Sequence, residues 1–157
     1  MKRFLNITFV LLLSPFALFA QNDSVRFCSK KHFDDFRIKA YTGRAARLDL
    51  GSNSIAHQFR TRIRKGYGSG SNFAGHYTFI KWGCGSPCQQ AVIVDRLTGF
   101  IYDAPGASNG YEYHIDSKML IVNPPSERGY YAADCFWCVP EIYVWNEQKK
   151  KFMKHKA

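Results

Sequence analysis

Residues 82–88 read WGCGSPC and carry two cysteines four positions apart in a run of turn-forming residues. Two thiols this close could form a disulfide, bind a metal ion or act as a redox couple. A disulfide needs Cα atoms within about 4.4–6.8 Å, and a Gly-Ser-Pro interior folds back readily enough to provide that distance. We therefore predict a Cys84–Cys88 disulfide that closes a short loop.

The other three cysteines leave more than one pairing open. Cys135 and Cys138 lie in the run YYAADCFWCV, and in an extended strand their side chains would point to opposite faces, about 10 Å apart at the Cα atoms. They can bridge only if the chain turns at this point; otherwise one of them could pair with Cys28. Five is an odd number, so at least one thiol is left over or pairs between chains.

Zinc binding and redox chemistry compete with these disulfides. The C-x3-C and C-x2-C pairs together offer four thiolates, as in zinc ribbons, although an oxidising compartment favours disulfides. A redox couple at CFWC needs a thiolate-stabilising site such as a helix N-terminus, and the sequence that follows, VPEIYVW, is typical of a strand. We predict no metal ligands and no other cofactor.

His76 has the most suggestive setting of the histidines. It begins the predicted strand 76–82, at the end of the run NFAGHY, and Asp95 ends the next strand, so antiparallel pairing would bring the two side chains close together. Ser86 completes the residue types of a Ser/His/Asp set, but no nucleophile elbow or oxyanion glycine pattern accompanies it. We expect His76 to be a hydrogen-bonded structural residue and name no catalytic residue.

The first twenty residues have the pattern of a secretory signal peptide. Lys2 and Arg3 precede an apolar run that Ser14-Pro15 breaks, and Ala20 is the expected cleavage position. We therefore predict a signal peptide over residues 1–20 and a mature chain that is periplasmic or secreted. No later segment is long and apolar enough to cross a membrane, and an exported protein is a poor candidate for binding nucleic acid.

Charge is distributed unevenly along the sequence, which has a formal net charge of +10. Residues 21–65 carry 11 basic and 4 acidic groups, residues 66–148 carry 4 basic and 8 acidic groups, and residues 149–157 add five lysines. Basic ends on an exported protein suit an anionic envelope component or an acidic protein. The interpretation that we favour is that they are the solvated faces of a helix and a C-terminal strand.

Short β-rich runs separated by turns follow residue 75. In chain order they span 76–82, 90–95, 99–103, 111–115, 118–123, 130–139, 141–146 and 150–155. The links are too short for crossover helices, so the strands must be largely antiparallel. Before them, residues 45–50 could form a short strand, and apolar residues repeat every four positions in a predicted helix over 52–66.

These elements predict an α+β, mainly β fold. We expect an antiparallel meander, either a half-barrel or a sandwich, with one N-terminal helix packed against it. The 137 residues from 21 to 157 are the size of a single domain. The polar stretches PGASNG (105–110) and NPPSERG (123–129) could ring one end of the sheet, where binding sites often lie.

The run NFAGHYTFIKWGCGSPCQQAVIVDRLTGFIYD (72–103) resembles a pattern shared by small exported bacterial proteins without a characterised activity. The segments FRTR (59–62), IDSKMLIVNP and EIYVWN are similar as well. The resemblance implies an exported β-rich domain and supplies no reaction. A weaker local likeness is to periplasmic inhibitors of vertebrate lysozyme, whose cysteine-closed loop carries a histidine where this chain has Gly-Ser-Pro.

Together these features favour an exported, non-catalytic binding or inhibitor-like domain that presents its disulfide-closed loop to a protein or an anionic envelope component. The expected binding residues are His76, Trp82, Gly85, Ser86 and Pro87. Two alternatives remain open: a small envelope hydrolase that uses His76 with a carboxylate, and a zinc-stabilised interaction module.

Overall fold

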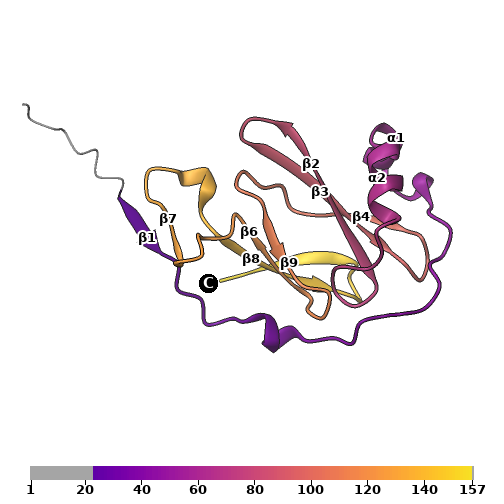
Figure 1. The fold of residues 1–157 in the computed structure, drawn as a ribbon, viewed down its shortest axis with the longest axis horizontal. Helices are drawn as coiled ribbons and strands as arrows, with labels where there is room; N and C mark the ends of the chain where they lie inside the picture. Colours follow the sequence, from indigo (N-terminus) through magenta and orange to yellow (C-terminus); the bar gives the residue numbers. More distant parts are fainter. Residues whose placement is uncertain (1–22, 157) are drawn as a thin grey trace, which may run out of the picture.

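The computed structural model of the protein describes residues 23–156, and the predicted signal peptide (residues 1–20) lies outside these described residues. The fold is mainly β, with antiparallel sheets and few helices, as predicted (Figure 1). The strands are β1 (Ser24–Arg26), β2 (Tyr77–Gly85), β3 (Cys88–Asp95), β4 (Ile101–Asp103), β5 (Tyr111–Tyr113), β6 (Met119–Val122), β7 (Tyr130–Ala132), β8 (Glu141–Asn146) and β9 (Lys151–His155). The helices are α1 (Ser54–Gln58) and α2 (Arg60–Tyr67), with short 3-10 turns η1 (Phe33–Phe36), η2 (Leu50–Ser52) and η3 (Phe136–Cys138).

The strands form three antiparallel sheets. One sheet has the order β2-β3-β4, a second has the order β5-β6-β8-β9, and β1 pairs with β7 in a small separate ribbon. Three short turns connect neighbouring strands: the one at residues 95–99 joins β3 to β4, the one at 116–117 joins β5 to β6, and the one at 146–148 joins β8 to β9. Neighbours along the chain therefore pair, as short links require.

The two larger sheets pack face to face as a sandwich. Ile93 of β3 and Leu120 of β6 belong to the core between the sheets, whereas their neighbours Val94 and Met119 belong to the outer faces. This division follows from the two-residue period of a strand. The inner core is rich in aromatic side chains, which are Phe73, Tyr77, Phe79, Tyr111 and Trp145.

Each outer face of the sandwich has its own cover. Helices α1 and α2 lie over the β2-β3-β4 sheet (Figure 1), where Ile63 is fully buried. The N-terminal segment runs along the other sheet, and its Phe27, Phe33 and Phe36 pack on Met119 and Ile142. Both sheets are thus apolar on two sides, which explains their nearly continuous hydrophobic runs.

The segment predicted as one helix contains two. Asn53 begins α1, since its Oδ1 accepts hydrogen bonds from the backbone N–H groups of Ile55 and Ala56 at 2.8 and 3.3 Å. Phe59 then leaves the helical conformation, with φ −105° and ψ 20°, and α2 follows directly. After the break, α2 packs against β2, and its Gly66 lies close to Ile80.

Two predicted strands differ in the structure. Residues 45–50 form no strand, because their backbone makes only isolated hydrogen bonds to the β3–β4 turn, such as Ala46 N–H to the Arg96 carbonyl. The run 130–139 is a strand only over β7. Beyond β7 the chain turns, and the Cys138 N–H donates to the Cys135 carbonyl at 3.0 Å, which brings the two cysteines together.

Candidate functional site

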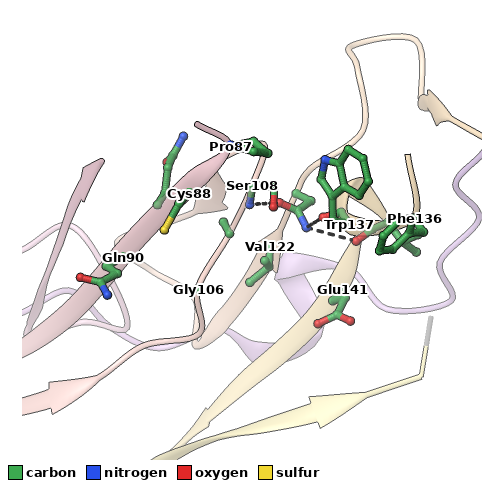
Figure 2. Close-up of a pocket in the computed structure, with 13 residues that line it drawn as sticks. Pro87, Cys88, Gln90, Gly106, Ser108, Val122, Phe136, Trp137 and Glu141 are labelled. Atoms are coloured by element: carbon green, nitrogen blue, oxygen red, sulfur yellow. Dashed lines mark hydrogen bonds between the residues drawn. The ribbon is translucent and has the colours of Figure 1, made fainter. Parts of the chain in front are cut away.

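A groove of about 490 Å³ opens between the two disulfide-closed turns (Figure 2). The tip of the β2–β3 hairpin supplies Pro87 and Cys88 on one side, and the η3 turn supplies Phe136 and Trp137 on the other. Residues 106–108 and the end of β6 lie between these walls. Both cysteine pairs therefore shape one concave surface, although Cys88 and Cys135 are 47 positions apart in the sequence.

The first wall is held by the predicted disulfide. Cys84 and Cys88 are bonded, with their Cα atoms 5.1 Å apart, and Gly85 between them has φ 127°, a conformation that glycine adopts most easily. After the tip, Gln89 exchanges both backbone hydrogen bonds with Ala107, at 2.7 and 2.9 Å. The 105–110 loop is therefore fastened to the hairpin.

The second wall presents two aromatic side chains. Cys135 and Cys138 are bonded with Cα atoms 5.2 Å apart, so the local pairing is formed and Cys28 is a free, exposed thiol. Between them, Phe136 and Trp137 are 79% and 47% exposed, and their rings meet edge to face with centroids 4.5 Å apart. Exposed aromatic residues on a covalently closed turn are typical of contact surfaces.

Asn123 joins the two walls beneath the groove. Its backbone has φ 53°, in the left-handed region that asparagine tolerates better than most residues. Its Oδ1 accepts hydrogen bonds from the N–H groups of Ser108 and Asn109, both at 2.7 Å. Its Nδ2 donates to the carbonyl of Trp137 at 3.0 Å, among the bonds dashed beside Ser108 and Trp137 in Figure 2. One side chain thus fixes the spacing of two loops.

Glu141 is the carboxylate in the groove lining. The hydroxyl of Tyr143 donates to it at 2.7 Å and Nζ of Lys154 at 2.6 Å. Burial alone would raise the pKa of Glu141, but these hydrogen bonds lower it below the usual value. Burial and the same hydrogen bond raise the pKa of Tyr143 to about 12. Glu141 is therefore ionised and already paired, and aromatic rings and amides dominate what the groove offers.

The five residues expected to form the binding surface do not come together. Pro87 lines the groove, and Gly85 and Ser86 lie at the exposed hairpin tip beside it. Trp82 is only 7% exposed and belongs to the core beneath the helices. His76 precedes β2 at the end of the hairpin opposite the disulfide. The surface around the loop is completed instead by the CFWC turn.

His76 lies in a separate polar cluster. Its Nε2 is 3.6 Å from Oδ1 of Asp95 and 3.8 Å from Oε1 of Glu147, which confirms the predicted proximity of His76 and Asp95. This nitrogen is buried and has no hydrogen-bond partner within the described part of the chain. Ser86 is at the other end of β2, so the structure does not assemble the Ser/His/Asp set.

Glu147 is the centre of that cluster. It accepts hydrogen bonds from the Tyr77 hydroxyl at 2.8 Å and from Nε1 of Trp145 at 2.8 Å, and it pairs with Lys150. Burial alone would raise the pKa of Glu147, but the hydrogen bonds from Lys150, Tyr77 and Trp145 lower it. Burial alone would lower the pKa of Lys150, but the hydrogen bond to Glu147 raises it above the usual value. The cluster fastens the β8–β9 turn to the start of β2.

Across residues 23–156 there is no group of three or more His, Cys, Asp and Glu side chains that could hold a metal ion. Both cysteine pairs are oxidised, so neither offers thiolates to zinc in this state. The helices of the same residues include none with the length and apolar composition needed to cross a bilayer.

Two features of the sequence indicate parts of the groove, whereas nothing in the sequence indicates the role of Asn123. The polar stretches 105–110 and 123–129 each supply part of the lining, in keeping with the expectation that they ring one end of the sheet. The sequence CFWC contains Phe136 and Trp137, but its prediction as part of a strand gave no indication that both side chains are exposed. Nothing local marks Asn123, because its partners lie 14 or 15 residues away in the sequence.

No protein-family model matches the chain, and no curated protein and no solved structure shows a significant match to it. The resemblance to small exported proteins stays a prediction from the NFAGHY and WGCGxxC motifs.

Proposed function

We propose that this chain is an exported, non-catalytic binding domain whose binding surface is the groove between its two disulfide-closed turns. The observation that carries the proposal is the pair Phe136 and Trp137, strongly exposed on a turn that a disulfide and Asn123 hold in place. Large aromatic side chains with restricted motion lose little conformational freedom on binding. They are among the residue types that contribute most to protein interfaces.

Two lines of support favour an envelope or extracellular setting. The first twenty residues follow the signal-peptide pattern, and two disulfides persist most readily in oxidising compartments. The motifs NFAGHY and WGCGxxC add a resemblance to other small exported proteins. A periplasmic or secreted location is therefore part of the proposal.

The chemistry of the groove favours a protein partner. Glu141 is neutralised by Lys154, so no strong charge in the lining selects for an ion. Gln89 and Ser108 bring polar side chains to the same surface on which Phe136 and Trp137 offer apolar area. A protein loop with one apolar side chain and free backbone groups would match this combination.

The proposal can be tested by site-specific photocrosslinking in cells. A benzophenone amino acid placed at Phe136 should give a discrete protein adduct in the envelope fraction. The matched control is the same amino acid at Phe100, which is also exposed, at 46%, but lies in the β3–β4 connection. With the crosslinked partner purified, Trp137→Ala should weaken binding by about 30-fold, as expected for a hot-spot residue. Adducts of equal yield at both positions, or none at either, would contradict the proposal.

One observation favours a second candidate, hydrolysis of envelope material through His76. Its buried Nε2 makes no hydrogen bond to another described residue and lies near Asp95 and Glu147, so these carboxylates could orient the imidazole and leave Nδ1 as the general base. The test is hydrolysis of p-nitrophenyl acetate by the purified protein and by His76→Gln. Hydrolysis that falls at least 100-fold in the variant, with unchanged thermal unfolding, would support this candidate. Equal rates would exclude it for ester substrates.

A further inference from the structure

The part of the chain that forms α2 and β2 is strongly one-sided in charge. No carboxylate occurs between Asp49 and Asp95. The same stretch carries five cations, which are Arg60, Arg62, Arg64, Lys65 and Lys81. None of the five forms an ion pair with another of the described residues. Unpaired cations concentrated in one region create a positive potential that attracts anions.

Three of these cations line one concave surface. A cavity of about 600 Å³ lies along the contact between α2 and β2, and its lining includes Arg62, Lys65, Ser69 and Lys81. Arg62 and Lys65 are three positions apart in α2 and therefore share a face of the helix. Lys81 comes from the neighbouring strand, so cations enter the surface from two elements.

Arg62 is held in position by its surroundings. Its Nη1 donates to the carbonyl of Gly83 at 3.4 Å, and its guanidinium lies 5.9 Å from the centre of the Phe59 ring. Phe59 in turn packs on Trp82, with ring centroids 4.7 Å apart. The charge is thus presented from a supported side chain, with donors left over for an anion.

The apolar residues around this surface are all used in packing. Ile63, Ile80 and Trp82 are buried, and Gly66 lets α2 approach so closely that a Cβ there would be 2.8 Å from Cγ2 of Ile80. A bilayer surface binds amphipathic helices through apolar side chains beside the charges. The α2 helix has none to offer, so a chain-like anion that enters a concave surface fits better than a membrane.

We propose that the α2–β2 surface binds a linear polyanion, a polymer with repeated phosphate or carboxylate groups, through Arg62, Lys65 and Lys81. Lys65 lies in the last turn of α2, where it also offsets the helix dipole. Arg62 and Lys81 are not in that last turn. The site shares no residue with the groove between the disulfides, so this proposal does not depend on the binding function proposed for that groove.

The test compares two variants that remove equal charge. One is Arg62→Gln with Lys65→Gln and Lys81→Gln. The matched control is Lys149→Gln with Lys151→Gln and Lys156→Gln, three exposed lysines at the C-terminal end that are also outside any ion pair of the described residues. Binding of fluorescently labelled polyphosphate and of labelled poly-L-glutamate is followed by anisotropy at low and at moderate salt.

The α2–β2 variant should lose at least about tenfold in affinity for polyphosphate, whereas the control should change by less than about threefold. Wild-type affinity should fall steeply with added salt, since polymer binding releases counterions. Should the triple variant unfold, the pair Lys65→Gln and Lys81→Gln, both on exposed residues, serves in its place.

Equal losses in the two variants would overturn the proposal, because they would show attraction to net charge alone. Binding to phosphatidylglycerol vesicles without binding to either polymer would also overturn it, in favour of a membrane. Stronger binding of polyphosphate than of poly-L-glutamate would identify phosphate as the recognised group, and the reverse order would identify carboxylate; both support the site.

Discussion

Replacing Asn123 by alanine should release the two walls of the groove from each other. The change removes the two hydrogen bonds that Oδ1 accepts from Ser108 and Asn109 and the one that Nδ2 donates to Trp137. At about 1 kcal/mol each, they amount to about 3 kcal/mol. Alanine at φ 53° adds about 1 kcal/mol of backbone strain. We therefore expect Asn123→Ala to lower the free energy of unfolding by about 3–4 kcal/mol.

Urea unfolding followed by circular dichroism measures this loss, and two further variants divide it. Asn123→Gly removes the same hydrogen bonds without the backbone strain, so it should cost about 1 kcal/mol less than alanine. Asn123→Asp retains the acceptor that binds Ser108 and Asn109, and should cost only about 1–2 kcal/mol. If Asn123→Gly were as stable as the wild type, the hydrogen bonds would contribute nothing to stability and Asn123 would not be what holds the two walls of the groove together.

Three other outcomes are expected. Removing either disulfide, by Cys84→Ser with Cys88→Ser or by Cys135→Ser with Cys138→Ser, should lower the free energy of unfolding by about 2 kcal/mol, which denaturant curves would test against the loop-entropy model. Thermal melts across pH should show stability lost as pH falls below 4.5, the ordinary pKa of Glu147, because that pKa is depressed in the fold. Stability should also be lost as pH rises above 10.5, because the pKa of Lys150 is raised; Glu147→Gln should flatten both limbs. Gly66→Ala should destabilise by about 1–2 kcal/mol despite alanine's higher helix propensity, since its Cβ would press on Ile80, and a more stable variant would contradict that packing.

Most of the strands could be predicted because their signals are local. Strands β3 and β6 contain short, continuous apolar runs, AVIV and MLIV, that end near turn residues, and the turn at residues 95–99 is set by its own chemistry, with Oδ1 of Asp95 accepting from the Leu97 N–H at 2.8 Å. The segment CFWC was harder. Its aromatic and β-branched neighbours favour a strand. The disulfide that turns the chain joins two residues, and single-residue strand propensity does not take such a bond into account.

The pairing of Cys84 with Cys88 could be predicted from the sequence, because a separation of four positions and a Gly-Ser-Pro interior bring the two Cα atoms within the range of a disulfide. The groove beside them was not. Its walls come from residues 87–90 and 136–141, and its base from residues 106–108 and 122–123. These segments meet only because the two sheets stack through a shared aromatic core and Asn123 ties their loops together. The geometry of a short turn is determined by the few residues that form it, whereas a surface made of distant loops depends on how the sheets pack.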